Sequence, residues 1–318
     1  MLAVETRHVS RRYGKVHAVQ DLNLSIPKGS LFGLIGPNGA GKTTTLRMLA
    51  GLLAPSSGEI LIGGEPVGKD GGELQRRIGY MPDFYGVYED MVVWEYLDFF
   101  ARCHGLASDR RKQVVDELLD LVDLGEKRDA YVQTLSRGMR QRLCLAHALV
   151  HEPEVLLLDE PASGLDPRAR VEMRELLREL GAMGKTIVLS SHILVELAEL
   201  CDSIAIIEKG KVVTSGLLSE IRSRAQLAKR IRMRLLTPVA DALRVLQATP
   251  GVVVSNAPGE GSPDEANGVL EFEFSGNDEA AAELLETLIA QKVRLVTFEE
   301  VPTGLEELFL QLTQGEVV

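Results

Sequence analysis

A glycine-rich segment, residues 36–44, has the residue types and spacing that bind the phosphates of a nucleotide. Its sequence GPNGAGKTT fits the pattern G-x-x-x-x-G-K-[ST] between the apolar run Leu31–Ile35 and a stretch with helical spacing. Glycines let successive backbone N–H groups turn toward phosphate oxygens, and the N-terminus of the following helix adds partial positive charge. We expect Lys42 to meet the β and γ phosphates and the Thr43 hydroxyl to ligate Mg²⁺. The nucleotide-binding residues predicted from this loop are Gly36, Pro37, Asn38, Gly39, Ala40, Gly41, Lys42, Thr43 and Thr44.

An acidic pair, Asp159 and Glu160, follows the apolar residues Val155–Leu158, which are typical of a buried parallel strand. Mg²⁺ usually keeps several waters, so we expect Asp159 to hold the ion through one of them. Glu160 is then free to orient or deprotonate an attacking water. A phosphate-binding loop without an acidic partner would be incomplete. We therefore interpret Asp159 and Glu160 as the residues that hold the metal and the attacking water in the same site as the loop.

The segment LSRGMRQRL, residues 135–143, resembles the LSGGQ signature of ATP-binding cassette (ABC) ATPases. The resemblance spans roughly residues 2 to 225 and includes, in family order, an aromatic residue before the loop (Tyr13), a D-loop at residues 163–166 that ends in Asp166, and a switch histidine (His192). This resemblance implies a P-loop NTPase core of the α/β class with an antiparallel β subdomain, and it implies that the nucleotide is ATP.

The same resemblance implies roles for these residues. Tyr13 would stack on adenine, and Ser136 and Gly138 would contact the γ-phosphate held by a second subunit, so that two chains sandwich two ATP molecules head to tail. The residue types agree, because Ser136 stands where it would cap a helix whose positive end could face an anion. His192, at a predicted strand end, is a plausible γ-phosphate sensor.

Three residues depart from the family pattern. Asp83 stands where the family usually has the glutamine of the Q-loop, and its shorter, charged side chain would either bind Mg²⁺ more strongly or fail to reach it. Arg137 and Met139 interrupt the signature. Arg137 would either add positive charge near the partner's phosphates or be a solvated surface residue.

Composition limits the other possibilities. The 318 residues, 45% of them hydrophobic, are enough for one large and one smaller core, while no apolar run approaches the ~18 residues that cross a bilayer. The N-terminus lacks the apolar middle of a signal peptide, and the odd, widely spaced cysteines (Cys103, Cys144, Cys201) fit reduced, mostly buried thiols. We therefore expect a cytoplasmic protein with no direct membrane insertion.

The C-terminal part carries most of the negative charge. From Lys229 onward the chain has 7 basic and 15 acidic residues, a net charge of −8 out of −11. Such a segment is a poor match to a nucleic-acid backbone, so no nucleic-acid partner is expected. Its periodicity indicates the order βαββαβ, a small α+β ferredoxin-like domain with a turn at residues 257–267, followed by a helix near GLEELFLQLT. This ending resembles the C-terminal extension of drug-resistance and nodulation-type ABC exporter subunits.

These patterns predict two domains, an ABC ATPase domain at residues 1–225 and an accessory domain at 228–318. Helical spacing between Asp83 and the signature indicates a helical subdomain at about residues 84–150, inserted into the ATPase domain. In the family, this subdomain receives the coupling helices of a membrane permease. The aromatic residues of FYGVYEDMVVW, residues 84–94, are either a docking patch for that permease or ordinary packing inside the subdomain.

The function predicted from all these features is that of an ATP-hydrolysing subunit of an ABC exporter. It would work as a dimer, more readily a homodimer than a heterodimer, at the inner face of the cell membrane with a separate integral permease. Two alternatives are a soluble ABC ATPase of translation or chromosome maintenance and a weakly active regulatory module. Two-cassette translation factors and heptad-rich chromosome ATPases do not resemble this chain, and Glu160 and His192 are intact.

Overall fold

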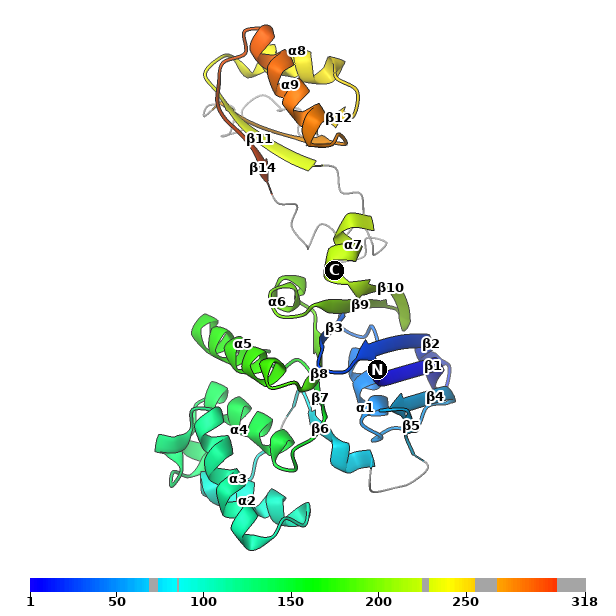
Figure 1. Cartoon of the computed structure of the whole chain (residues 1–318), viewed down its shortest axis with the longest axis vertical. Helices are drawn as coiled ribbons and strands as arrows, with labels where there is room; N and C mark the ends of the chain where they lie inside the picture. The colour runs from blue at the N-terminus through cyan, green and yellow to red at the C-terminus, as the bar shows by residue number, and fades with distance from the viewer. Residues whose placement is uncertain (69–73, 85, 225–228, 255–267, 302–318) are drawn as a thin grey trace. The chain divides into compact units, whose positions relative to one another are not determined.

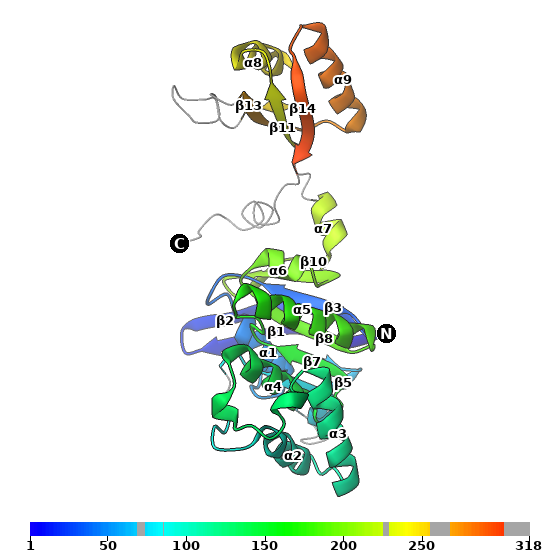
Figure 2. The same cartoon turned by 90° about the vertical axis from the view of Figure 1, so that its left-hand side faces the viewer.

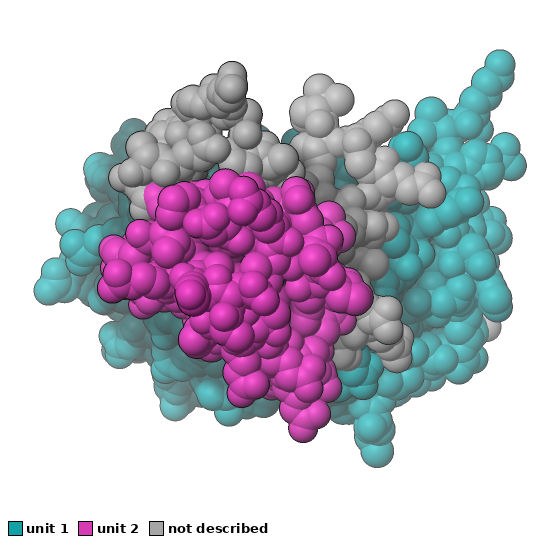
Figure 3. Space-filling view, turned by 90° about the horizontal axis from the view of Figure 1, so that it is seen from above, with its two compact units in different colours: residues 1–221, 313–318 teal, residues 222–312 magenta. Residues whose placement is uncertain are grey.

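The computed structural model describes residues 1–68, 74–84, 86–224, 229–254 and 268–301. Contacts between residues divide the chain into two compact units, of which the first runs from Met1 to Ile221 and the second begins at Arg222 (Figures 1 and 3). Each unit has its own hydrophobic core. The predicted turn at 257–267 and the predicted terminal helix near GLEELFLQLT lie outside the described residues.

A six-stranded sheet forms the centre of the first unit, in the order β10-β9-β3-β8-β7-β6. All neighbours pair in parallel except β10 and β9, which pair antiparallel. The strands are β3 (Leu31–Ile35), β6 (Ile78–Met81), β7 (Val155–Leu158), β8 (Thr186–Ser191), β9 (Ser203–Glu208) and β10 (Lys211–Leu217). Every residue of β7 and β8 is buried, which explains the apolar run of β7 and the apolar residues Ile187, Val188 and Leu189 of β8. The predicted strands at Leu31–Ile35 and Val155–Leu158 are confirmed.

A second, antiparallel sheet has the order β2-β1-β4-β5. Its strands are β1 (Leu2–Tyr13), β2 (Val16–Pro27), β4 (Ser57–Ile62) and β5 (Glu65–Pro66). Helix α1 (Lys42–Leu49) contributes Leu46, Met48 and Leu49 to the core that this sheet shares with Phe32 of β3. The shared core fixes α1, and with it the loop that precedes it, between the two sheets.

Helices lie between β6 and β7 in the chain, as the apolar spacing predicts. They are α2 (Val93–Cys103), α3 (Ser108–Leu121) and α4 (Arg137–Leu149), joined by short 3₁₀ turns at Gly125–Lys127 and Val132–Thr134; another precedes β6 at Leu74–Arg77. Figure 2 shows α2 and α3 beside α4, away from the antiparallel sheet. Three more helices follow β7, namely α5 (Pro167–Ala182), α6 (Leu194–Ala198) and α7 (Leu218–Arg224).

The second unit has the element order β11 (Lys229–Leu235), α8 (Val239–Ala248), β12 (Val252–Val253), β13 (Val269–Phe274), α9 (Asp278–Ala290) and β14 (Leu295–Val301). Its four strands form an antiparallel sheet in the order β12-β13-β11-β14. Alternate residues of β11 and β13 are buried, including Met233 and Phe272, and they pack with Leu246 of α8 and Leu288 of α9. One face of the sheet is thus covered by both helices.

Two further expectations concern membranes and cysteines. No helix among the described residues combines the length and apolarity that a membrane span requires.

All three cysteines are free, Cys103 exposed and Cys144 and Cys201 buried. Burial raises the pKa of the Cys144 thiol to about 12 and also raises that of Cys201. The two buried thiols are therefore unreactive packing groups.

Candidate nucleotide-binding and hydrolysis site

The glycine-rich loop connects the end of β3 to the start of α1, and its glycines are required by close backbone approaches. A side chain at Gly36 would collide with the carbonyl oxygen of Ile207. Gly41, the N-cap of α1, has φ 109°, and a Cβ there would lie 2.5 Å from the carbonyl oxygen of Ala18. The left-handed backbone of Gly41, and the absence of side chains at Gly36 and Gly41, allow the loop to pass this close to the neighbouring backbone before α1 begins. The sequence pattern alone predicts this strand, loop and helix.

Lys42 is folded over this loop. Its Nζ donates hydrogen bonds to the carbonyl oxygens of Gly36, at 2.7 Å, and Pro37, at 3.3 Å, and the residue is only 6% exposed. The loop residues 38–44 line a pocket of about 350 Å³ together with Ala18, Asp83, Glu160, Ser163 and His192. The ammonium group of Lys42 and the N-terminus of α1 therefore both contribute positive charge to this pocket.

Asp159 is the most buried carboxylate of the site, with 1% of its surface exposed. Its Oδ1 accepts hydrogen bonds from the hydroxyls of Thr43, at 3.1 Å, and Ser190, at 2.7 Å. Its Oδ2 is buried and has no hydrogen-bond partner among the described residues. A buried carboxylate oxygen without a donor is costly, and a hydrated cation would satisfy it. Thr43 and Asp159 therefore fit a Mg²⁺ ion.

No group of three His, Cys, Asp or Glu side chains in the described ranges forms a metal site by itself. Mg²⁺ typically takes one or two carboxylates and completes its shell with water and substrate phosphates. The hydroxyl of Thr43 and the carboxylate of Asp159 match this coordination preference. Ser190 supports the set from β8, and this role is not visible from its position in the sequence.

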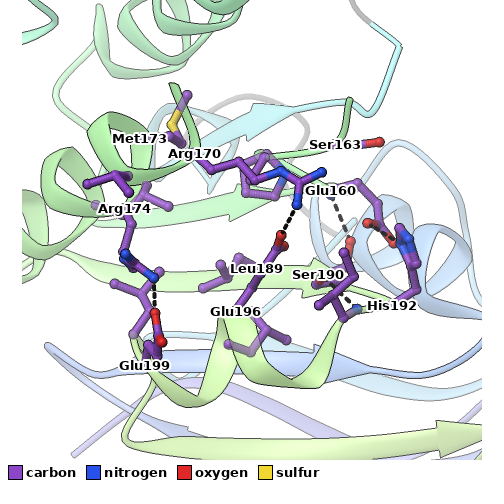
Figure 4. A pocket seen from close by; sticks show the side chains of 18 of the residues that line it. Glu160, Ser163, Arg170, Met173, Arg174, Leu189, Ser190, His192, Glu196 and Glu199 are labelled. Atoms are coloured by element: carbon purple, nitrogen blue, oxygen red, sulfur yellow. Dashed lines mark hydrogen bonds and ion pairs between the residues drawn. The ribbon is translucent and has the colours of Figure 1, made fainter. Parts of the chain in front are cut away.

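Glu160 lies between two cationic or protonatable groups. Its Oε1 is 3.3 Å from Nζ of Lys42 and its Oε2 is 2.9 Å from Nδ1 of His192. Its backbone N–H donates to Oγ of Ser190 at 3.0 Å, and its φ of 49° is in the left-handed region that non-glycine residues rarely adopt. Such strain persists only where surrounding contacts enforce it, and it is concentrated at functional sites. Figure 4 shows Glu160, Ser190 and His192 converging at one end of a second pocket.

This second pocket, of about 420 Å³, extends from Glu160 and His192 along α5 and α6. Ion pairs between Arg170 and Glu196, at 3.2 Å, and between Arg174 and Glu199 lie across it. It contains no residue of the glycine-rich loop. The residues of the glycine-rich loop line the smaller pocket instead, and we call that one the phosphate pocket.

Asp83 lies two residues beyond β6 and is exposed at the rim of the phosphate pocket. Burial, followed by the charges of Asp159 and Glu160, raises the pKa of the Asp83 carboxyl above its ordinary value, while Arg137 and His192 act in the opposite direction. Asp159 and Glu160 therefore both repel the Asp83 carboxylate, and a divalent cation would relieve that repulsion. This agrees with the expectation that Asp83 binds the metal.

Tyr13, at the end of β1, lies outside the residues that line the phosphate pocket. Its ring is 46% exposed, and the guanidinium of Arg11 lies 4.7 Å from the ring centroid. Arg11 is itself anchored, because it donates to the carbonyl oxygen of Ala54 at 2.8 Å. One face of the ring is thus covered by a cation, which leaves its remaining surface for a flat base.

The signature and the D-loop lie together in another part of the same unit. Ser136 is the N-cap of α4 and accepts from the N–H of Met139 at 3.2 Å, while Asp166 caps α5 by accepting from the N–H of Ala169 at 2.9 Å. Ser136, Gly138 and Asp166 line one groove of about 330 Å³. That groove and the phosphate pocket share no residue. The helix start at Ser136 confirms the capping prediction.

Two side chains of α4 reach the segment after Glu160. Arg137 Nη2 donates to the carbonyl oxygen of Ser163 at 3.1 Å, and the buried Gln141 donates to the carbonyl oxygen of Pro161. Arg137 is exposed but bonded, so neither of the two expectations for it describes this structure fully. Nothing in the local sequence around Gln141 indicates its contact with Pro161, 20 positions away.

Comparison with known proteins gives the family. A model of the ABC transporter family matches residues 19–163. "Nod factor export ATP-binding protein I" of Burkholderia orbicola (strain AU 1054) is 45% identical over 213 residues, which are 67% of this chain and 70% of the relative. A solved ATP-binding subunit of an ABC transporter superimposes with a TM-score of 0.64 at 32% identity, over 70% of this chain and 93% of that one.

A dimeric ATP-binding cassette, solved after hydrolysis with ADP and phosphate bound, gives a TM-score of 0.62 at 25% identity and covers 68% of this chain and 98% of its own. The matching parts are therefore ATP-binding cassettes with the α/β fold of the first unit. This chain belongs to the family of ABC transporter ATP-binding proteins, the subunits that bind and hydrolyse ATP to drive transport.

Proposed function

We propose that this chain hydrolyses ATP at an interface shared by two nucleotide-binding subunits and that closure of the pair drives a separate membrane permease. One observation carries the proposal. The groove with Ser136 and Gly138 has no residue in common with the phosphate pocket, although the family resemblance requires both to contact one ATP. The signature of one chain would therefore complete the phosphate pocket of another. Because one chain holds both halves, two identical copies would suffice, which favours a homodimer.

The chemistry proposed at the pocket is an in-line attack of water on the γ-phosphate. Glu160 would orient and deprotonate that water, since its carboxylate is held by His192 at 2.9 Å. Lys42 would leave the loop carbonyls and neutralise phosphate charge. Thr43 and Asp159 would hold Mg²⁺, with Asp83 as a third ligand at the rim, and the ion when bound would neutralise charge on the β and γ phosphates. The loop residues Gly36 to Thr44 would cradle the phosphates, and Tyr13 would stack on adenine.

Export is the direction we propose. The relatives found are named for Nod factor export, and this chain covers 70% of the length of the first of them. Their cargo is not transferred to this chain, because the permease, not the ATPase, contacts the cargo in the proposed complex. The subunit would then be held at the inner face of the cell membrane through its permease, without inserting into the bilayer and without a nucleic-acid partner.

We propose the helical subdomain as the permease-docking region. Phe84 is 89% exposed, which is unusual for a large aromatic side chain and supports docking. The ring centroid of Tyr88 lies 6.0 Å from that of Phe99 and 6.3 Å from that of Phe100, while the residue is 55% exposed. Tyr88 would therefore serve both packing inside the subdomain and the docking surface.

For the second unit we propose a ferredoxin-like accessory domain at residues 228–318, next to an ATPase domain at 1–225. The element order βαββαβ supports it, as does the antiparallel strand order β12-β13-β11-β14, in which each outer strand pairs with one of two central strands. The residues that line the phosphate pocket all lie in the first unit.

The variant Glu160→Gln tests the proposed site. Its amide keeps the shape of the carboxylate but cannot accept a proton, so hydrolysis should fall by about 100-fold or more while ATP binding remains. We expect an ATP-dependent dimer in gel filtration with Mg²⁺ present and a monomer without nucleotide. The matched control Glu175→Gln removes an exposed carboxylate on α5 and should behave like the parent.

A Glu160→Gln protein that stays monomeric and turns over ATP at the parental rate would contradict this mechanism. The transport function has a separate test, which is affinity purification of the full chain from its own cells. An integral membrane protein should copurify, whereas ribosomes or DNA in its place would point to a soluble ABC ATPase.

A further inference from the structure

The segment that carries Glu160 is held from two sides. Residues 160–163, which we call the catalytic turn, are closed by a hydrogen bond from the N–H of Ser163 to the carbonyl oxygen of Glu160, at 3.0 Å. On one side, the N–H of Glu160 donates to Oγ of Ser190. On the other side, α4 donates to the turn through Arg137 and Gln141. The left-handed backbone of Glu160 is thus enforced by contacts at both ends of the turn.

Arg137 and Gln141 are four residues apart and so lie on the same face of α4. Gln141 is 2% exposed and bonds to Pro161 in the interior, whereas Arg137 bonds to Ser163 at the surface. The guanidinium also lies directly over Gly164, where a Cβ would collide with it. Gly164 has φ +66°, so both its backbone and its missing side chain accommodate the arginine.

Arg137 stands between Ser136 and Gly138, the two signature residues proposed to contact the ATP of the partner subunit. Its guanidinium nevertheless donates to the D-loop of its own chain. We propose that Arg137 is a positioning residue that connects the signature of this chain to its own catalytic turn, so that engagement of the partner's ATP by the signature sets the position of Glu160. This inference rests on the proposed two-subunit site.

The effect expected from losing this contact is on turnover rather than on ATP affinity. Arg137 bonds to Ser163, which lines the pocket, but to no residue of the loop, so the ATP affinity should change little. A misplaced Glu160 slows the attack of water, and displacements of the order of 1 Å in a reacting group reduce rates by up to about 100-fold. We therefore expect Arg137→Gln to lower kcat by about tenfold and to change KM by less than about twofold.

The control is Arg178→Gln on α5. Arg178 also donates to a backbone carbonyl, that of Glu199 at 2.8 Å, and it is similarly exposed, but Glu199 is not part of the catalytic turn. Arg178→Gln removes the same charge and the same kind of hydrogen bond as Arg137→Gln, and the kcat of this control should equal that of the parent. Arg137→Lys keeps a donor without the planar fork and should recover part of the lost kcat.

The variant Gly164→Ala disrupts the same contact in a second way. It keeps the arginine, but the added Cβ occupies the space where the Arg137 guanidinium lies. Because both substitutions break one contact, the double variant Arg137→Gln with Gly164→Ala should be no slower than the slower of the two single variants. Additive losses would show that the two residues act independently, and they would overturn the inference.

Two other outcomes would also overturn it. If Arg137→Gln raises KM at unchanged kcat, and raises the ATP concentration needed to form the dimer in the Glu160→Gln background, then Arg137 binds the partner's phosphates directly. If Arg137→Gln and Arg178→Gln are both like the parent, Arg137 is a surface residue without a role. Failure of the proposed function looks different, because then the parent chain itself would neither hydrolyse ATP nor allow a Glu160→Gln dimer.

Discussion

At the scale of single residues, Asp83 and Glu160 line the phosphate pocket and Asp159 bonds to Thr43 of its loop; Asp83 is the carboxylate that departs from the family pattern. Asp159 is fixed by the Thr43 and Ser190 hydroxyls, and Glu160 is held by Lys42 and His192, whereas Asp83 is exposed at the rim. Partial burial, followed by repulsion from the other two carboxylates, raises the pKa of the Asp83 carboxyl. Asp83 is therefore the carboxylate that the site loses with least disturbance.

We predict that Asp83→Gln preserves or raises ATP hydrolysis. The amide removes one negative charge from the pocket and supplies the residue type that the family usually has there, while Thr43 and Asp159 still hold the metal. The measurement is kcat together with the Mg²⁺ concentration that gives half-maximal activity. Asp90→Asn, in the same exposed segment but outside the pocket, controls for the change of net charge.

Complete loss of hydrolysis in Asp83→Gln, with a higher Mg²⁺ requirement than that of Asp90→Asn, would contradict this prediction. It would show that the Asp83 carboxylate is an obligatory metal ligand.

At the scale of elements, the packing of α2 against α4 contains a half-buried histidine. His147 of α4 stacks on Phe100 of α2 with ring centroids 3.6 Å apart, and its Nδ1 is 3.4 Å from the hydroxyl of Tyr96. Burial, helped by the nearby His104 and His151, lowers the pKa of His147 to about 4. The contact between the two helices thus depends on a neutral imidazole.

This arrangement predicts an acid-sensitive helical subdomain. Above pH 6.5 the imidazole of His147 is neutral in both the folded and the unfolded chain, so it adds no pH dependence. As the pH falls from 6.5 toward 4, only the unfolded chain gains the proton, so the free energy of unfolding decreases, by up to about 3 kcal/mol from this group. Urea unfolding between pH 7.5 and 4.5 would measure the decrease.

The comparison that isolates His147 is His147→Phe, which keeps a ring against Phe100 and removes the titrating group. Its free energy of unfolding should vary less with pH over this range than that of the parent. His17→Gln removes an exposed histidine of β2 and should leave the parental slope. Equal slopes in the parent and His147→Phe would exclude His147 as the source of acid sensitivity.

At the scale of the whole molecule, the two units have separate hydrophobic cores. The core of the first includes Phe32 and Leu46, and that of the second includes Met233, Phe272 and Leu288. The phosphate pocket is built only from residues of the first unit. A ligand stabilises only the cooperative unit that binds it, so nucleotide binding should distinguish the two.

We predict that calorimetry of the Glu160→Gln chain shows two unfolding transitions and that ATP with Mg²⁺ raises the temperature of only one. At 100 times the dissociation constant, binding adds about 2.7 kcal/mol to the stability of the binding unit. Phe272→Ala, which empties a core position of the second unit, should lower the transition that ATP leaves unchanged. One transition, shifted as a whole by ATP and by Phe272→Ala, would show that the units unfold together.

Several features of this protein were determined by the sequence alone, because they depend on neighbours along the chain. The loop at residues 36–44 needs glycines, a lysine and a hydroxyl at fixed spacing. The apolar run Val155–Leu158 delivers Asp159 and Glu160 to a strand end, and Ser136 caps the helix that follows it. The six elements of the second unit likewise follow from local periodicity. Each of these predictions is confirmed by the secondary structure.

Contacts between distant residues were decided only by the tertiary structure. Thr43 and Asp159 are 116 positions apart, and their hydrogen bond exists because α1 packs against β7 of the central sheet. Ser190 bonds to Asp159 because β8 pairs with β7 in that sheet. From the sequence, Arg137 would either contact the partner's phosphates or be a solvated surface residue. In the structure, α4 lies beside the D-loop, and the guanidinium of Arg137 donates to Ser163. Local spacing sets which residues form an element, but the direction in which a side chain finds its partner depends on how the elements pack.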